Sequence, residues 1–208
     1  KHFRMTGGEP LMDVNTYKVL DYVIEHPKPD LTLEITSNFC VEDPLFDKFI
    51  SRISHLDRQS SIRHIGLYAS IDNWNTASEY VRFGMQFEKF VNNVHRFLKE
   101  TEKTSLCFIN TFNCLSVTGL EDMLEAVLFL RDTYSQKLNR VRFNAPVLTY
   151  PDWQGLQVLP ENYWVKMEKR IEFMEKNRTP GPRSNQGFRD FEISQLRRNL
   201  ELMKTPLP

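Results

Sequence analysis

The sequence predicts an α/β protein in which a parallel sheet winds into a partial (β/α) barrel. Three observations favour this class. Strand-like and helix-like segments alternate along the 208 residues, as is typical of parallel sheets with right-handed connections. Hydrophobic residues make up 40% of the chain and the formal net charge is zero, which fits a globular domain with a sizeable core. Polar segments follow each predicted strand, at the edge where parallel barrels collect their ligands.

Five segments have the pattern of β-strands. Leu31–Ser37, for example, alternates apolar and polar residues. The third predicted strand has a polar face, which suggests a barrel that is open or liganded inside, although a strand exposed on one face would give the same pattern. That face consists of His64, Gly66, Tyr68, Ser70 and Asp72. The predicted strands are His2–Met5, Leu31–Ser37, Ile62–Asp72, Thr104–Thr111 and Asn139–Thr149.

The intervening segments have helical spacing or helix-start signals. Asp43-Pro44 predicts an N-cap followed by a first-turn proline, and Thr118–Glu121 has the form of a capping box. Tyr80 and Gly84 fall on the apolar face of the longest predicted helix. The predicted helices are Val14–Glu25, one from Asp43 through Ile53, Glu79–Glu100, Leu120–Tyr134, one that opens at Pro160, and Phe191–Met203. Residues 177–187 are a loop by composition.

The most informative motif is Thr6-Gly7-Gly8-Glu9-Pro10, between the first strand and the first helix. A glycine pair lets the backbone approach a ligand closely. The carboxylate beside it can hold an ammonium group, and the proline fixes the entry to the helix. A plain glycine turn before a helix is the structural alternative.

This pentapeptide resembles the signature that follows the second strand of the radical S-adenosylmethionine enzymes. The resemblance implies that the turn binds the amino group of the cofactor's methionine moiety. It also implies that the chain carries strand–helix units two to six of that family's partial barrel. On this interpretation residues 1–176 form the barrel core, and residues 177–208 are a loop and short helix that lead to a C-terminal extension.

Other strand ends extend the resemblance. Ser70-Ile71-Asp72 resembles a Ser-x-Asp segment of the family, which implies cofactor contacts for Ser70 and Asp72. Asn38 aligns with the turn after the family's third strand. The cofactor-binding residues implied in this way are Gly7, Gly8, Glu9, Pro10, Ser37, Asn38, Ser70, Asp72 and Asn110.

Longer phrases resemble one subgroup, the proteins with a twitch domain, in which a shortened C-terminal extension holds an auxiliary iron–sulfur cluster. They are 79–84, 113–116 and 151–160. The resemblance implies that Arg82 is a substrate-side cation, and an exposed helix arginine is the alternative. Asn113 and Tyr150 are weaker candidates for substrate contact.

The three cysteines, Cys40, Cys107 and Cys114, have no metal-ligand spacing. The family holds a [4Fe–4S] cluster with three cysteines in a C-x-x-x-C-x-x-C loop. The resemblance therefore implies that the cluster ligands lie outside this chain. We interpret the cysteines present as ordinary small buried residues, with a substrate-side role open for Cys40 and Cys114.

Three interpretations follow. The first is a truncated radical enzyme, in which the cluster loop precedes Lys1 and radical chemistry abstracts hydrogen from a substrate. The second is a cluster-less barrel that binds a small molecule or a partner. The third is a metal-free barrel with Glu9, His64 and Asp72 as general acids and bases.

Composition also limits the partners. No run approaches about 18 apolar residues, there is no signal-peptide pattern and there is no basic stripe, so neither a membrane nor a nucleic acid is expected. The odd, low cysteine count predicts a cytoplasmic protein. The resemblance implies an electron donor such as flavodoxin or ferredoxin, and a peptide or small polar metabolite as substrate. The strand His2–Met5 is expected to have an unpaired edge, which lowers solubility.

Overall fold

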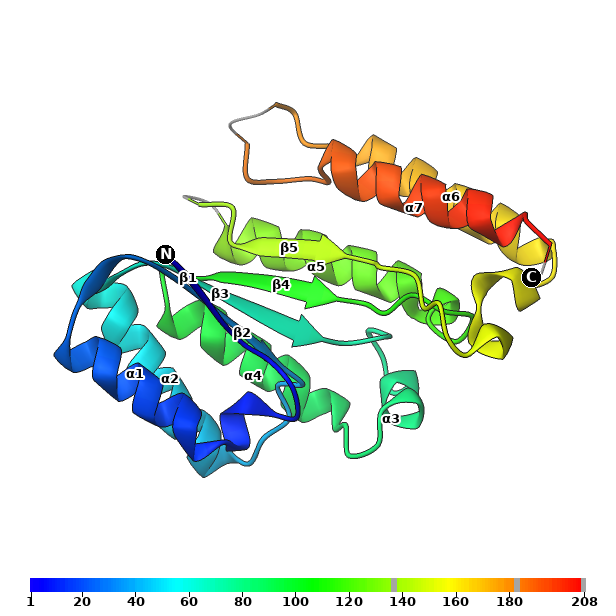
Figure 1. The fold of residues 1–208 in the computed structure, drawn as a ribbon. Helices are drawn as coiled ribbons and strands as arrows, with labels where there is room; N and C mark the ends of the chain where they lie inside the picture. The colour runs from blue at the N-terminus through cyan, green and yellow to red at the C-terminus, as the bar shows by residue number, and fades with distance from the viewer. Residues whose placement is uncertain (136–137, 182–183, 207–208) are drawn as a thin grey trace. The chain divides into compact units, whose positions relative to one another are not determined.

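The computed structural model describes residues 1–135, 138–181 and 184–206. In these residues the chain is α/β, with seven α-helices and one all-parallel sheet of five strands in the order β1-β2-β3-β4-β5 (Figure 1). The predicted α/β class with a parallel sheet is therefore confirmed.

The chain forms two compact units, which are described in turn. Unit 1 comprises Lys1–Ser70 and Gly84–Cys107. Unit 2 comprises Ile71–Phe83 and the chain from Phe108 onward. Neither unit is continuous in sequence.

Unit 1 is a set of parallel strands with helices packed on one side. Its elements are β1 (His2–Met5), the 3₁₀ turn η1 (Pro10–Met12), α1 (Val14–Glu25), β2 (Lys28–Ser37), α2 (Asp43–Gln59), β3 (Ile62–Ser70), α4 (Phe87–Glu100) and the first three residues of β4 (Ser105–Ile109). β1 pairs with β2 and β2 pairs with β3, with Met5 beside Ile35 and Thr36 beside Tyr68. Helices α1, α2 and α4 lie on the same side of β1–β3 (Figure 1).

Strand alternation decides which side chains meet these helices. On β2 and β3 the alternate residues Leu33, Ile35, Ile65, Leu67 and Ala69 are buried. The residues between them on β3, His64, Tyr68 and Ser70, are half-buried. The predicted polar face of the third strand is confirmed for His64, Tyr68 and Ser70, because side chains alternate across a strand, whereas Asp72 lies beyond the end of β3.

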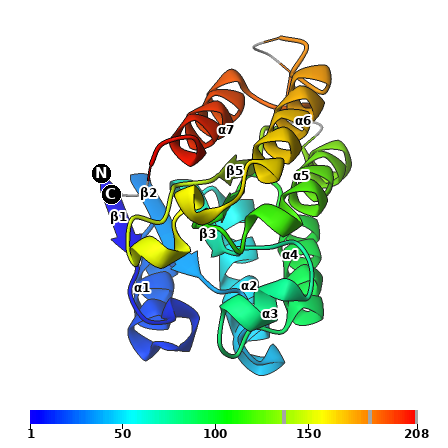
Figure 2. The same ribbon diagram turned by 90° about the vertical axis from the view of Figure 1, so that its right-hand side faces the viewer.

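Unit 2 contains α3 (Ala77–Val81), the end of β4, α5 (Leu120–Tyr134), β5 (Val141–Asn144), α6 (Asn162–Lys176) and α7 (Asp190–Met203). Helices α6 and α7 lie side by side (Figure 2). Glu192 on α7 is fully buried and forms an ion pair with Arg131 on α5. The segment after Lys176 therefore packs with the elements before it. Outside the bridge between Arg178 and Phe188, the predicted loop 177–187 has no strand or helix in its described residues, and Pro182 and Arg183 lie outside them.

The prediction of one long helix at Glu79–Glu100 is wrong, because the structure has two separate helices in this segment. α3 ends at Val81 and α4 begins at Phe87. Gly84 has φ +79°, a left-handed conformation that a right-handed helix cannot include. Tyr80, expected on the buried face, is 86% exposed.

The predicted capping box is also wrong. α5 begins at Leu120 with Gly119 as its cap, and the Thr118 hydroxyl donates to the Leu115 carbonyl instead. A 3₁₀ turn, η2 (Val117–Gly119), precedes the helix and takes Thr118 out of the capping position. At α2 the N-cap is Glu42, so Asp43 lies in the first turn.

Four strands differ in length from their predictions, and β4 (Ser105–Ile109) is shorter at both ends than the predicted Thr104–Thr111. β2 begins earlier, at Lys28, and β3 ends at Ser70, so Asp72 lies in the turn that follows. β5 ends at Asn144, well before the predicted end. Pro146 lies just beyond it and has no N–H to donate to a ladder.

Candidate functional site

The candidate site in unit 1 begins with the glycine pair after β1. Gly7 has φ +91° and Gly8 has φ +58°, values that residues with a side chain rarely adopt. A Cβ built on either glycine would have no heavy atom within 4 Å. Conformation rather than packing therefore requires glycine here, and the space beside the turn is open to a ligand.

Glu9 connects this turn to the turn after β2. Its Oε1 accepts hydrogen bonds from the Leu11 N–H (3.0 Å) and the Ser37 hydroxyl (2.7 Å). Its Oε2 accepts one from the Asn38 N–H (2.7 Å). A carboxylate offers about four lone-pair positions, so one remains, on Oε2.

Further acceptors lie in the same turn. Among the described residues, no hydrogen bond to the carbonyl of Gly7 or Gly8 is recorded. Backbone carbonyls are strong acceptors that normally find a partner or face water. Oε2 of Glu9 is a further acceptor in the same turn, and acceptors of these kinds suit the N–H groups of an ammonium ion.

The second turn of the site, Ser37-Asn38-Phe39, is held firmly. The buried Ser37 hydroxyl accepts from the Phe39 N–H (2.9 Å), and Asn38 Oδ1 accepts from the Cys40 N–H (2.9 Å). Phe39 has φ +61°, and its carbonyl accepts from Asn93 Nδ2 (3.0 Å). Its ring lies edge-on in a buried aromatic cluster with Phe46, Phe90 and Phe97. This packing fixes the position of the Asn38 N–H that meets Glu9.

Ser70 ends β3 and is half-buried. Ser37 at the end of β2 pairs in register with Ala69. Because the strands are parallel, Ser70 lies at the same edge of the unit 1 sheet as the two turns. The structure therefore gathers Gly7, Gly8, Glu9, Pro10, Ser37, Asn38 and Ser70 at one sheet edge.

Unit 2 holds a second group of predicted residues, centred on Asp72. This buried carboxylate accepts from Arg82 Nε (2.5 Å) and Nη2 (3.2 Å). Asn110 Nδ2 donates to the Asp72 carbonyl (2.9 Å). Asn110 Oδ1 and Asn73 Nδ2 are buried, and neither has a partner among the described residues. Arg82 is thus paired with a carboxylate of its own unit, and its side chain is 29% exposed.

Asn113 and Tyr150 have other surroundings within unit 2. Asn113 stabilises its own turn, since Oδ1 accepts from the Leu115 N–H and Nδ2 donates to the Thr111 carbonyl. Tyr150 is 81% exposed and precedes a cis proline. No recorded contact joins either residue to Asp72 within the described residues.

The cysteines differ in burial. Cys107 is buried, as expected, whereas Cys40 and Cys114 are half-buried, so the interpretation of these two as buried residues is wrong. Burial nevertheless raises the pKa of the Cys114 thiol above its ordinary value. The described residues contain no group of three or more His, Cys, Asp or Glu side chains that could hold a metal ion. These residues therefore do not fit an iron–sulfur cluster.

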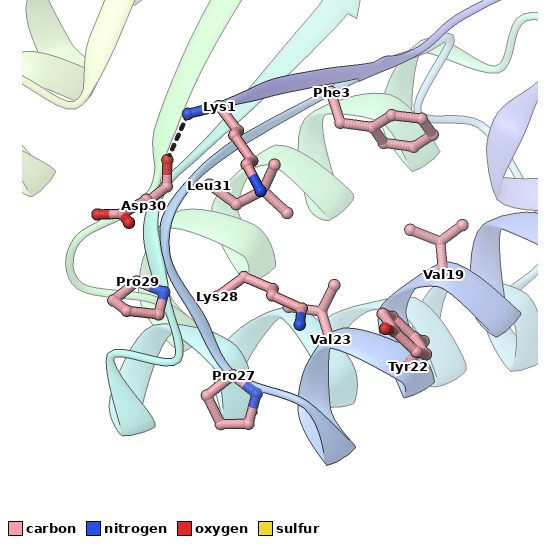
Figure 3. A pocket seen from close by; sticks show the side chains of 10 residues that line it. All are labelled: Lys1, Phe3, Val19, Tyr22, Val23, Pro27, Lys28, Pro29, Asp30 and Leu31. Atoms are coloured by element: carbon pink, nitrogen blue, oxygen red, sulfur yellow. Dashed lines mark hydrogen bonds between the residues drawn. The ribbon is translucent and has the colours of Figure 1, made fainter.

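A cavity of about 450 Å³ in unit 1 lies away from this site (Figure 3). Phe3 of β1, Leu31 of β2 and Val19 of α1 contribute apolar walls, and Tyr22 and Lys28 also line it. Leu31 lies in the first half of β2, so the cavity is at the opposite end of the strands from the glycine turn. Asp30 also lines this cavity, and its carbonyl accepts from the N-terminal ammonium group of Lys1 (2.8 Å; Figure 3).

Sequence reasoning missed two residues that shape unit 1. Asn93 on α4 fixes the Phe39 carbonyl, and only the fold reveals that long-range contact. Glu34 lies on the half-buried face of β2, where Tyr68 donates to it (2.7 Å). The available signal was a carboxylate between the apolar and threonine residues of 31–36.

In comparisons with known proteins, no family model, no curated protein and no solved structure matches this chain. Among the described residues, no helix combines the length and the hydropathy that a membrane crossing requires. The cytoplasmic location and the electron donor stay predictions.

Proposed function

We propose that this chain binds S-adenosylmethionine through the Gly7-Gly8-Glu9 turn and belongs to a radical S-adenosylmethionine enzyme whose sheet is part of a partial (β/α) barrel. The observation that carries this proposal is the acceptor set of the turn. It consists of the Gly7 and Gly8 carbonyls, which have no recorded partner in the part of the chain that the structure describes, and the one remaining lone pair of Glu9 Oε2. The α-ammonium group of the cofactor supplies three N–H donors for such a set.

Other residues of unit 1 have supporting roles in this proposal. Ser37 and the Asn38 N–H hold the Glu9 carboxylate in place, so its orientation does not depend on the ligand. The Ser70 hydroxyl, at the same sheet edge, would contact the cofactor's carboxylate or ribose. In unit 2, cofactor contacts for Asp72 and Asn110 and substrate contacts for Arg82, Asn113 and Tyr150 stay predictions.

The radical chemistry requires a [4Fe–4S] cluster in addition to the cofactor. When bound to such a cluster, S-adenosylmethionine supplies a carbon radical that abstracts hydrogen from a substrate. The described residues do not fit the cluster, so its ligands would come from outside this chain. The part assigned to the chain itself is to bind and orient the cofactor.

The test is calorimetric binding of S-adenosylmethionine to the full 208-residue chain and to Glu9→Gln. A hydrogen bond to a charged group contributes about 1.5–3 kcal/mol, so we expect about 10- to 100-fold weaker binding. The same cofactor without its amino group should bind wild type and Glu9→Gln equally weakly. This second ligand separates loss of the ammonium contact from a general change in the turn.

Asp13→Asn is the matched control. Asp13 caps α1 through the Asn15 N–H (2.9 Å), so the substitution removes one negative charge from the next turn and leaves Glu9 intact. We expect wild-type affinity from this variant. Equal affinity of wild type and Glu9→Gln would overturn the proposal.

A further inference from the structure

Three charged or polar side chains meet on the face of unit 1 that α1, α2 and α4 do not cover. They are Arg4 of β1, Glu34 of β2 and Tyr68 of β3. Arg4 and Glu34 are partners in the strand register, and Tyr68 is beside Thr36, two residues further along β2. The three side chains therefore come from three neighbouring strands.

Tyr68 and Glu34 form the fixed part of this cluster. The Tyr68 hydroxyl donates to Glu34 Oε1 (2.7 Å), and His2 Nε2 lies 3.0 Å from Oε2. The Glu34 side chain is 17% exposed. These two contacts use about half of the roughly four lone-pair positions of the carboxylate.

Arg4 is the part of the cluster with spare capacity. Its guanidinium lies over the Tyr68 ring, with Cζ 5.0 Å from the ring centroid, and its Nε is 3.9 Å from Glu34 Oε2. No hydrogen bond from this guanidinium is recorded within the described residues, although it carries five N–H donors in a rigid fork. The side chain is 48% exposed, so a ligand can reach the fork.

The cluster continues into the candidate site. Arg4 is three residues before Gly7 on the same chain segment, and Tyr68 is two residues before Ser70. Side chains at i and i+2 share a strand face, so the polar face of β3 passes from Tyr68 to Ser70 at the sheet edge. A ligand beside the glycine turn is therefore within the reach of this face.

We propose that Arg4 binds a carboxylate group of a second ligand, which lies on this face beside the glycine turn. Stacking on Tyr68 orients the guanidinium plane for bidentate contact with a planar carboxylate. Glu34 lies close enough to repel a second negative charge, so a monoanionic carboxylate suits the cluster better than a phosphate dianion. If the proposed function is correct, this second ligand is the substrate. Only that assignment rests on the proposed function.

The test is a titration of the full chain with sodium acetate. Binding is measured by NMR, from the chemical shift of the Arg4 side-chain Nε–Hε group. Sodium chloride and sodium phosphate at matched ionic strength are the other arms. We expect a saturable shift with acetate, a weaker response to phosphate and none to chloride. Glu34→Gln should bind acetate severalfold more tightly, because the competing carboxylate is gone.

Arg4→Gln has no Arg4 side-chain resonance, so its acetate binding is followed by the chemical shifts of the neighbouring backbone amides. We expect this variant to bind acetate at least tenfold more weakly than the wild type. Arg63→Gln is the matched control, since Arg63 is another exposed arginine of unit 1, on β3, and its loss should change nothing. A shift that survives in Arg4→Gln, or one that chloride reproduces, would mean non-specific anion binding and overturn the inference. Binding of phosphate as tight as acetate would overturn the assignment to a carboxylate.

The experiments distinguish failure of cofactor binding at Glu9 from failure of carboxylate binding at Arg4. Arg4→Gln should leave S-adenosylmethionine binding unchanged, because the hydrogen bonds recorded for the Glu9 carboxylate come from Leu11, Ser37 and Asn38. If Glu9→Gln leaves cofactor binding intact while Arg4→Gln abolishes acetate binding, the carboxylate site stands and the proposed function falls.

Discussion

At Glu9, one carboxylate serves both the protein and the proposed ligand. Two hydrogen bonds, from Ser37 and Asn38, join two turns that are 28 or 29 residues apart in sequence, and a third, from the Leu11 N–H, lies within the first turn. The same bonds orient the remaining lone pair, so a ligand ammonium meets a carboxylate that is already fixed. Such preorganisation increases affinity because little side-chain freedom is lost on binding.

Gly7→Ala should destabilise the protein by about 1–2 kcal/mol, because a Cβ makes the left-handed conformation at φ +91° costly. Since no atom lies within 4 Å of the new Cβ, the cost comes from the backbone and not from a clash. Urea unfolding measures the change.

Gly66→Ala is the control for that prediction. Gly66 lies on β3 without a positive φ, and an added Cβ would meet its neighbours at ordinary distances, the nearest being 3.6 Å away. We expect a change within about 0.5 kcal/mol. If Gly7→Ala is as stable as the wild type, the turn does not need its positive φ.

The glycine turn could be predicted because its signal is local. Two adjacent glycines before a proline specify a turn wherever the rest of the chain lies. The partners of Glu9 and Asp72 could not be predicted in this way. The hydrogen bonds from Ser37 to Glu9 and from Arg82 to Asp72 form only when the strands and turns have folded. No local sequence pattern therefore predicts either contact.

At the scale of whole elements, periodicity predicted most helices and failed where tertiary contacts decide. In α6, which corresponds to the helix predicted to open at Pro160, Met167, Ile171 and Met174 are buried at helical spacing. The segment between Val81 and Phe87 also has helical periodicity in sequence, yet Gly84 turns the chain there. A periodic pattern therefore predicted the buried face of α6 but not the break before α4.

Helix α7 is attached to unit 2 by a buried ion pair. Arg131 Nη2 donates to Glu192 Oε1 (2.6 Å), and the two side chains are 1% and 0% exposed. Glu192→Gln would leave the guanidinium without its charge partner in a buried site, so we expect a loss of about 3–5 kcal/mol in the free energy of unfolding. Thermal and urea unfolding measure this loss.

Glu121→Gln is the matched control at the element scale. It breaks the ion pair between Arg170 and Glu121, in which the Glu121 side chain is 62% exposed. A surface pair of this kind contributes about 1 kcal/mol or less. A combined Arg131→Met and Glu192→Leu variant should recover part of the loss, and equal effects of Glu192→Gln and Glu121→Gln would contradict the role assigned to the buried pair.

At the scale of the whole molecule, the sequence predicted the order and direction of the strands but not the two units. The segment Ile71–Phe83 belongs to unit 2, although unit 1 precedes it and follows it in sequence. Its place depends on long-range contacts, such as Trp74 against Phe108 and Asn73 with the Gly119 N–H. Secondary-structure patterns carry no information about such contacts.

The stability of the whole chain should fall at high pH because of Tyr68. Burial, and then its hydrogen bond to Glu34, raise the pKa of Tyr68 from 10.0 to about 12. The folded protein therefore keeps this proton at pH values where the unfolded chain has lost it. The stabilisation is fully present below pH 10 and is lost as the pH rises through about 12.

Comparison of wild type with Tyr68→Phe by urea unfolding between pH 9 and pH 12 isolates this effect, since phenylalanine has no proton to lose. Tyr68 is half-buried, so solvent screening limits the expected difference to about 1 kcal/mol. Glu34→Gln should move the fall to lower pH, because it removes the charge and the acceptor that hold the proton on Tyr68. Identical pH profiles for wild type and Tyr68→Phe would show that Tyr68 has no raised pKa. The hydrogen bond from Tyr68 to the Glu34 carboxylate would then lack the role in pH stability assigned to it.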